Sequence, residues 1–187
     1  IITDEEIFRA VLQVVGECGF AGATTKQMAE VANVSEVTLF RKYGNKFQLI
    51  KQAVEAVIAQ TDFGDVTEYT GDVAVDLLRV VDAYQGSAVK HGQFIFVLLS
   101  ELPRYPELAN LLDLPFSIFS NISQMISRYQ EEGIIRIEHP MHALSALLCP
   151  LIYNSMLCKA KFDPQIPPLD LANHVSVFLD GRRLAGG

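Results

Sequence analysis

The sequence predicts an all-α protein, and three observations lead to this fold class. Apolar residues recur at intervals of three and four along most of the 187 residues, which places them on one face of a helix. Residues that cap or terminate helices separate these stretches, and only the short run 134–137 is a candidate strand. Half of the residues are apolar, so a chain of this length can bury a sizeable core.

The first two helices are predicted from their capping residues. Thr3 and Glu6 have the spacing of a capping box, in which each side chain satisfies a backbone N–H group of the first turn. Apolar residues follow at helical spacing until Gly19, which favours a helix end. Thr24 and Gln27 form a second capping box, and the apolar stripe behind them predicts a second helix of about two turns.

A turn and a third short helix are predicted next. Asn33 tolerates the left-handed backbone conformation that a tight turn requires. Ser35 is a favourable N-cap, and Gly44 ends the helix. Leu39 and Tyr43 lie four residues apart, on one face, and we expect both to point inward.

The rest of the chain predicts one helix after another. A fourth helix, 47–59, leads out of the N-terminal unit, and 61–71 is predicted to be a loop because glycine, aspartate and threonine are dense there. Further helices are predicted at 72–91, 94–102, 106–112, 115–132, 141–159 and 169–183. We therefore divide the chain into an N-terminal three-helix domain, residues 1–47, and a second helical domain, residues 48–187.

The charge of the chain is unevenly distributed. The net charge of −7 argues against binding of nucleic acid over the whole surface. Residues 24–51, however, hold five lysines and arginines against two glutamates, a net charge of +3, so the remaining residues carry −10. A basic segment on an acidic protein can bind phosphates while the acidic remainder repels non-specific contacts.

The cysteines and the hydropathy pattern suggest a cellular location. Cys18, Cys149 and Cys158 are odd in number and have apolar neighbours, which predicts buried free thiols in a reducing compartment rather than disulfides or a zinc site. Nothing resembles a signal peptide, and no apolar run reaches the roughly 18–20 residues that cross a bilayer. We therefore expect a cytoplasmic protein without a membrane partner.

The segment 24–46 carries the strongest functional signal. Its two short helices, joined by residues 32–34, have the form of a helix-turn-helix, whose second helix enters the major groove of DNA. An outward Val37 would fit a thymine methyl group, Thr38 a base edge or a phosphate, and Glu36 the amino group of a cytosine. Phosphate contacts are expected from Thr24, Thr25, Lys26, Lys42 and Lys46.

The same segment resembles the TetR family of bacterial transcriptional regulators. The resemblance rests on "ATT" at 23–25, "NVS" at 33–35, "TLFRKY" at 38–43 and "GNK" at 44–46. Phe40 stands where the family commonly has a tyrosine that reaches a phosphate, and Lys42 stands where a histidine is common. The candidate DNA-binding residues are Thr24, Thr25, Lys26, Ser35, Glu36, Val37, Thr38, Phe40, Arg41, Lys42, Tyr43 and Lys46. For Glu36 a favourable first-turn charge is the alternative, and for Tyr43 a packed ring.

The helices after residue 71 have more apolar surface than one small bundle needs, which indicates a pocket, a subunit interface or both. The family resemblance implies both: a homodimer whose helices 141–159 and 169–183 form a four-helix interface, and a pocket for a small, apolar or aromatic effector. It also implies a regulator, most simply a repressor, that binds a palindromic operator and is released by the effector. The candidate pocket residues are Tyr84, His91, Phe116, Phe119, Ser123, Tyr153 and Asn154, with core packing as the alternative for each.

Two other classes of function compete with a DNA-binding regulator. An enzyme would need a catalytic constellation, but the sequence has no glycine-rich phosphate loop, nucleophile elbow or paired catalytic carboxylates. His139 and His142 have the spacing of a metal-binding pair, yet Pro140 separates them and no third ligand is near, so we expect neither a metal nor a cofactor. A helical interaction module, or a regulator controlled by a protein partner, would explain the apolar helices but not the basic segment.

Overall fold

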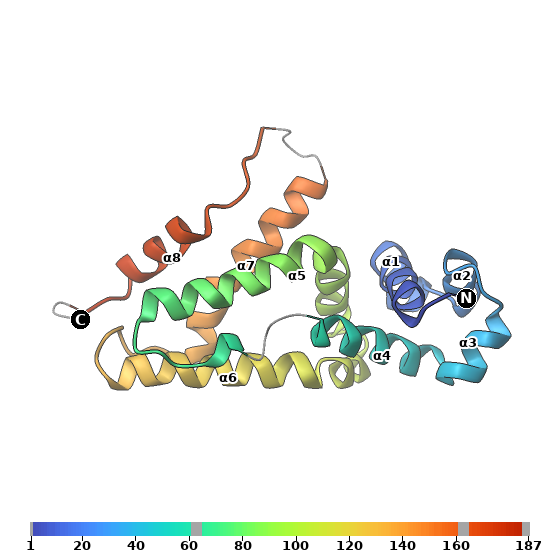
Figure 1. Ribbon diagram of the computed structural model, residues 1–187, viewed down its shortest axis with the longest axis horizontal. Helices are drawn as coiled ribbons and strands as arrows, with labels where there is room; N and C mark the ends of the chain where they lie inside the picture. The colour runs from blue at the N-terminus through green and yellow to red at the C-terminus, as the bar shows by residue number, and fades with distance from the viewer. Residues whose placement is uncertain (1, 61–64, 161–164, 185–187) are drawn as a thin grey trace. The chain divides into compact units, whose positions relative to one another are not determined.

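The computed structural model describes residues 2–60, 65–160 and 165–184 and confirms the all-α fold (Figure 1). The α-helices are α1 (Asp4–Gly22), α2 (Thr25–Val31), α3 (Glu36–Tyr43), α4 (Lys46–Ala59), α5 (Val73–Glu101), α6 (Asp113–Glu131), α7 (Pro140–Lys159) and α8 (Leu171–Asp180). Two short 3-10 helices, η1 (Asp65–Thr67) and η2 (Pro106–Leu111), lie before and after α5. The described residues contain no strand, and Ile135, within the candidate strand 134–137, forms only an isolated antiparallel bridge with Arg183.

The elements form two compact units. The first consists of Ile1–Thr61 with His91–Leu114, and the second of Asp62–Lys90 with Pro115–Gly187. Helix α5 contributes to both units, and so does α6, whose first two residues belong to the first unit. The first unit therefore contains α4 and the end of α5 in addition to the helix-turn-helix. The functional boundary after residue 47 falls inside this unit and stays a prediction.

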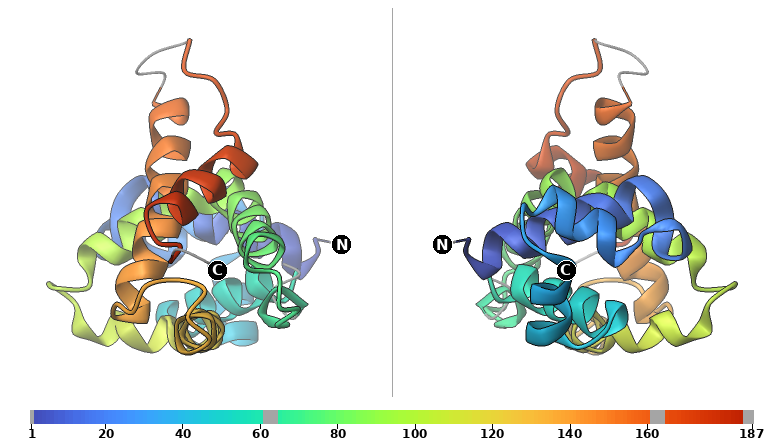
Figure 2. Two further views of the ribbon diagram at one scale, coloured as in Figure 1. Left: turned by 90° about the vertical axis from the view of Figure 1, so that its left-hand side faces the viewer. Right: turned by 90° about the vertical axis from the view of Figure 1, so that its right-hand side faces the viewer.

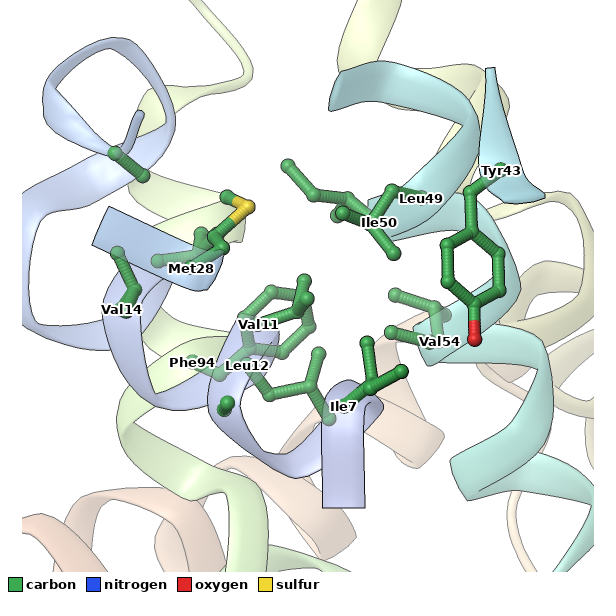
Figure 3. Packing of buried hydrophobic residues seen from close by; sticks show 14 of the residues in the cluster. Ile7, Val11, Leu12, Val14, Met28, Tyr43, Leu49, Ile50, Val54 and Phe94 are labelled. Carbon is green, nitrogen blue, oxygen red and sulfur yellow. The ribbon is translucent and has the colours of Figure 1, made fainter. Parts of the chain in front are cut away.

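The core of the first unit lies between α1, α2, α4 and the second half of α5. Val11, Met28 and Ile50 are fully buried, and the ring of Phe94 reaches the same cluster from α5 (Figure 3). Burial of such side chains stabilises the unit by about 2 kcal/mol each. Leu39 of α3 belongs to the same cluster, so α3 packs on this core through Leu39.

In the second unit, each of the three long helices buries one apolar face. Leu77 on α5, Ile126 on α6 and Leu147 on α7 have no exposed surface. The Ser155 hydroxyl of α7 donates to the carbonyl of Ala88 on α5 at 2.9 Å, so a hydrogen bond joins these two helices. The short helix α8 lies alongside the first turns of α5 (Figure 2).

A buried carboxylate joins the loop before α5 to α5 and α6. Asp76 has no exposed surface, and it accepts hydrogen bonds from the Thr70 backbone N–H at 2.9 Å and the Thr70 hydroxyl at 2.6 Å. The Tyr129 hydroxyl also donates to Asp76, and the Arg79 guanidinium pairs with it at 2.7 Å. Burial by itself would raise the pKa of Asp76, but these hydrogen bonds outweigh it and hold the pKa below its ordinary value.

Several helix ends differ from the prediction. Helix α1 continues to Gly22, although its backbone breaks at Gly19 as expected, with φ 74° and ψ 169°. The predicted helices 72–91 and 94–102 are one helix, because Gly92 is buried inside α5 and packing outweighs its poor helix propensity. The predicted helix 106–112 is the 3-10 helix η2. Helix α8 is shorter than the predicted range 169–183. Residues 61–64 of the predicted loop lie outside the described residues.

The prediction that the three cysteines are buried, which was based on their apolar neighbours, is wrong. Cys18, Cys149 and Cys158 are free, but all three are exposed rather than buried. Cys149 lies on α7, whose apolar residues continue from the buried face onto the exposed one, so apolar neighbours did not indicate burial.

Within the described ranges, α7 is long and apolar enough to cross a membrane, by length and composition only, and 39% of that stretch is buried in the protein. A helix in the core of a soluble protein can have the same length and composition.

Candidate nucleic-acid interface

Local hydrogen bonds fix the ends of the two helices of the helix-turn-helix. The Thr24 hydroxyl caps α2 by accepting from the Gln27 N–H, and Gln27 Oε1 accepts from the Thr24 N–H at 2.9 Å. Asn33 adopts a φ of 54° in the turn. Ser35 caps α3 by accepting from the Thr38 N–H at 3.1 Å. The predicted caps and the predicted turn are therefore confirmed.

Leu39 and Tyr43 form the inner face of α3, as their spacing predicts. They are 1% and 5% exposed. The Tyr43 ring centre lies 5.5 Å from that of Phe8 on α1, and the Tyr43 hydroxyl donates to Asp4 Oδ1 at 2.7 Å (Figure 3 shows the ring). Burial, followed by Asp4, raises the pKa of Tyr43 to about 12, so the hydroxyl stays protonated at neutral pH. The structure thus places Tyr43 in the packing between α3 and α1.

The outer face of α3 combines apolar and cationic side chains. Val37 is 75% exposed and Phe40 is 49% exposed, and the two lie three residues apart on one side of the helix. Arg41 is exposed in the last turn, and Lys26 is exposed on α2. Neither cation forms an ion pair within the described part of the chain. An apolar strip beside unpaired cations suits a surface that meets a partner.

Hydrogen bonds within the motif hold four other predicted contact residues. Thr25 donates from its hydroxyl to Glu36 Oε1 at 2.5 Å, which links α2 to α3. The hydroxyls of Ser35 and Thr38 share a hydrogen bond of 2.7 Å. These bonds orient the side chains at the start of α3. Each oxygen keeps further lone pairs that can accept from a base or from water.

Asp4 is a part of this surface that the sequence analysis missed. Its carboxylate pairs with the Lys42 ammonium as well as with Tyr43, and both side chains of the ion pair are about half exposed. The hydrogen bonds from Lys42 and Tyr43 lower the pKa of Asp4, so it is charged at neutral pH. Because an exposed ion pair is weak, a phosphate can compete for Lys42. No sequence signal joins two residues that lie 38 positions apart.

Lys46 is already bound inside the first unit. Its ammonium donates to the carbonyls of Phe20 at 2.7 Å and Ala23 at 3.1 Å, at the end of α1. It also lies 4.4 Å from the centre of the Phe20 ring. Burial lowers the pKa of Lys46, although the charge of Glu101 opposes this shift. Two of its three donors are therefore used, and a phosphate contact from Lys46 stays a prediction.

Three of the predicted pocket residues lie in the interior of the second unit or at its edge. Tyr84 is buried, and its ring centre lies 6.1 Å from that of the half-buried Phe119. Burial raises the pKa of Tyr84, so its hydroxyl is a neutral group. The Ser123 hydroxyl donates to Met141 Sδ at 3.1 Å, across α6 and α7. This arrangement agrees equally with core packing and with a ligand site.

The other predicted pocket residues lie apart from this interior group. Tyr153 is 64% exposed and Phe116 is 45% exposed, so both lie on the surface of the second unit. Asn154 is half-buried next to Tyr153, and His91 belongs to the first unit. A pocket of about 230 Å³ lies elsewhere in the second unit, between α5 and α8, and its lining includes Val75, Leu78, Val175, Ser176 and Arg183. None of these lining residues was predicted.

The described residues hold no group of three or more histidine, cysteine, aspartate or glutamate side chains that could bind a metal ion. The rings of His139 and His142 lie 5.1 Å apart, and His139 Nδ1 accepts from the backbone N–H of Met141 at the start of α7. His139 is therefore the N-cap of α7, and His142 lies in the first turn of that helix.

The chain is similar in sequence to known transcriptional regulators, although no protein-family model matches it. It is 30% identical over 138 residues to the uncharacterized HTH-type transcriptional regulator YvkB of Bacillus subtilis, and the match covers 72% of this chain and 71% of that protein. An uncharacterized HTH-type transcriptional regulator of Mycobacterium tuberculosis is 25% identical over 165 residues, which is 88% of this chain and 79% of the relative.

Solved structures share the fold over nearly the whole chain. A proposed TetR-family transcriptional regulator from Rhodococcus superposes with a TM-score of 0.72 at 20% identity, covering 95% of this chain and 97% of that one. A Clostridium perfringens protein, proposed to be a fatty acid metabolism regulator, gives a TM-score of 0.73 at 18% identity, with 94% and 97% covered.

Proposed function

Because this chain belongs to the TetR family of helix-turn-helix transcriptional regulators, we propose that it is a dimeric repressor that binds a palindromic DNA operator through α3 and is released by a small effector. The outer face of α3 is the observation that carries the DNA-binding role. There the exposed Val37 lies in the same helix as Arg41, which has no ion pair with any residue that the structure describes. A thymine methyl group and a neighbouring phosphate are suitable partners for these two groups.

The residues of the interface divide into two roles in this proposal. Val37 and Thr38 contact base edges in the major groove, because they lie at the start of α3 on its outer side or its flank. Phosphates bind the exposed cations, Lys26, Arg41 and Lys42, and the N-terminal end of α2. Tyr43 and Lys46 hold the motif together. The relatives are regulators, which supports a function without catalysis, in the cytoplasm, where bacterial DNA lies.

The second unit supports the proposed dimer through the outer faces of its last two helices. Tyr153 on α7 and Val177 on α8 are 64% and 62% exposed, and α7 is apolar on its exposed side as well as its buried side. Pairing these helices with a second copy would bury this surface and bring two copies of α3 to successive major grooves. The Tyr84 and Phe119 rings support an apolar or aromatic effector.

The first experiment is selection of duplexes from random DNA by the purified protein, at a stated salt concentration near physiological strength. We expect an enriched palindrome whose half-sites are about one helical turn apart. The enriched duplex then serves to screen apolar and aromatic compounds for release.

Two variants of matched chemistry make this test specific. Val37→Asn should weaken binding and change the preference at one base pair of each half-site, because the apolar contact is lost. The control is Val89→Asn, because Val89 is also a valine and is 52% exposed on α5. This variant should select the same palindrome as the wild type. Absence of any enriched sequence with the wild type would contradict operator binding. Release by a protein but by no compound would favour a regulator controlled by a protein partner.

A further inference from the structure

Helix α1 breaks near its end, at Gly19. An unbroken helix would join the backbone N–H of Phe20 to the carbonyl of Gly16, four residues earlier. With the backbone broken between them, both groups need other partners, because an unsatisfied polar group in a partly buried place is costly.

Two side chains of α5 supply these partners. Glu101 Oε2 accepts a hydrogen bond from the Phe20 N–H at 2.6 Å, and Gln93 Nε2 donates to the Gly16 carbonyl at 2.9 Å. The two helices are also in close contact here, since a Cβ atom at Gly16 would lie 3.5 Å from the backbone nitrogen of Phe94. All five residues belong to the first unit, so the end of α5 fixes the broken end of α1 within that unit.

The other backbone group of Phe20 is held by the helix that follows α3. Lys46 is the first residue of α4, and it donates to the carbonyls of Phe20 and Ala23. Ala23 directly precedes Thr24, the N-cap of α2. Phe20 is therefore bound by α5 through its N–H and by α4 through its carbonyl, at the point where the chain enters the helix-turn-helix.

We propose that Glu101 is a positioning residue for DNA binding, with Gln93 as its partner at the other end of the break. It touches no DNA, and it holds the end of α1 so that α2 and α3 keep the arrangement that fits the major groove. This inference rests on the proposed DNA-binding function. Neither side chain is among the groups that we assign to phosphates, since both lie on α5, so loss of either one removes no phosphate contact of the proposed interface.

The test compares DNA binding and folding in Glu101→Ala, Glu101→Gln and Gln93→Ala, each made in the full chain. Glu101→Gln keeps an oxygen that can accept from the Phe20 N–H. The control is Glu107→Ala, because Glu107 is an exposed glutamate of the same unit with no side-chain partner in the described part of the chain. Affinity for the duplex that the wild type selects is measured over a range of salt, and circular dichroism gives the folded fraction.

We expect the folded Glu101→Ala protein to bind the duplex roughly tenfold more weakly, the equivalent of one charge-assisted hydrogen bond. Its salt dependence should not change, because no phosphate contact is lost. Glu101→Gln should recover most of the affinity, and Gln93→Ala should lose less than Glu101→Ala. Faster hydrogen exchange at the Phe20 N–H would place the change at the α1 break.

Wild-type affinity in folded Glu101→Ala would overturn the proposal, as would a changed salt dependence, which would indicate an electrostatic effect on DNA. If Glu101→Ala does not fold, Gln93→Ala decides, and full affinity in that folded variant overturns the proposal. Failure of the proposed function is seen separately, because the wild type itself would then select no duplex.

Discussion

Asp4 neutralises one of the cations that we propose α3 presents to DNA. Its carboxylate contacts both Lys42, on the outer side of α3, and Tyr43, on the inner side. The contact with Tyr43 fixes the position of the helix, whereas the contact with Lys42 neutralises a cation that we assign to a phosphate. The two effects on DNA binding therefore have opposite signs, and an amide can separate them, because it keeps an acceptor and removes the charge.

Asp4→Asn should bind every duplex more tightly than the wild type, because Lys42 is then free to pair with a phosphate. The slope of log affinity against log salt should steepen by up to about one. The matched control is Glu5→Gln, since Glu5 lies in the same turn and, among the residues that the structure describes, pairs only with the exposed Arg9. This control measures the long-range effect of removing one negative charge. Weaker binding by Asp4→Asn than by Glu5→Gln would show that Asp4 acts mainly by holding α3.

Asp76 is a buried charged residue of the second unit, and its charge contributes to stability. Its pKa is lowered in the folded protein by hydrogen bonds that outweigh its burial. A carboxylate with a lowered folded pKa stabilises the protein above its unfolded pKa of about 3.9, and this contribution is lost as the pH falls through the folded value.

Asp76→Asn should lower the free energy of unfolding by about 3 kcal/mol at pH 7, because Arg79 loses its buried partner. The difference from the wild type should shrink below about pH 4, where the wild-type carboxylate also becomes protonated. Urea unfolding between pH 3 and pH 7 measures both effects. Asp82→Asn, an exposed position on the same helix, should match the wild type throughout. A difference that is constant with pH would contradict an ionised Asp76.

At the scale of elements, the sequence predicted those features that depend on close neighbours in the chain. The caps of α2 and α3 each join residues three positions apart, and the turn between them contains Asn33 with a φ of 54°. Contacts between distant segments could not be predicted, because they produce no pattern of spacing in the sequence. Phe20 and Glu101, for example, lie 81 positions apart. For the same reason Lys46 looked like one more cation of a basic segment, although its ammonium binds the end of α1.

The break in α1 requires glycine for two separate reasons. The φ and ψ of Gly19, 74° and 169°, lie in a region that only glycine occupies readily. A Cβ atom there would also lie 2.7 Å from Glu101 Oε1, which is too close. The Glu101 carboxylate can therefore occupy its place beside α1 only because residue 19 has no side chain.

Gly19→Ala should lower the free energy of unfolding by about 2 to 3 kcal/mol, through backbone strain and displacement of Glu101. Gly133→Ala is the matched control, because its φ is 69° and nothing lies within 4 Å of the added Cβ atom. The control should lose only about 1 kcal/mol. Chemical denaturation of the two variants measures the difference, and equal losses would show that Glu101 moves away without cost.

At the scale of the whole molecule, exposed apolar residues on α7 and α8 are the feature that a single chain does not explain. The exposure of Cys149 and Cys158 belongs to the same observation, since both lie on the exposed side of α7. Burial could not be predicted correctly for these residues from sequence, because the subunit interface that we propose for them would resemble a core in composition. A second copy of the chain would cover this surface, and it would also supply the second α3 that a palindromic operator needs.

Replacing both Tyr153 and Val177 by aspartate should convert the protein from a dimer to a folded monomer, because charges on both helices repel across a symmetric interface. Operator affinity should then fall by at least about a hundredfold, since each α3 binds its half-site alone. Analytical ultracentrifugation gives the mass, and circular dichroism shows that the helices persist. Ile137→Asp, at an apolar position that is 85% exposed outside α7 and α8, should remain dimeric and bind normally. A double variant that stays dimeric would place the subunit interface on another surface of the second unit.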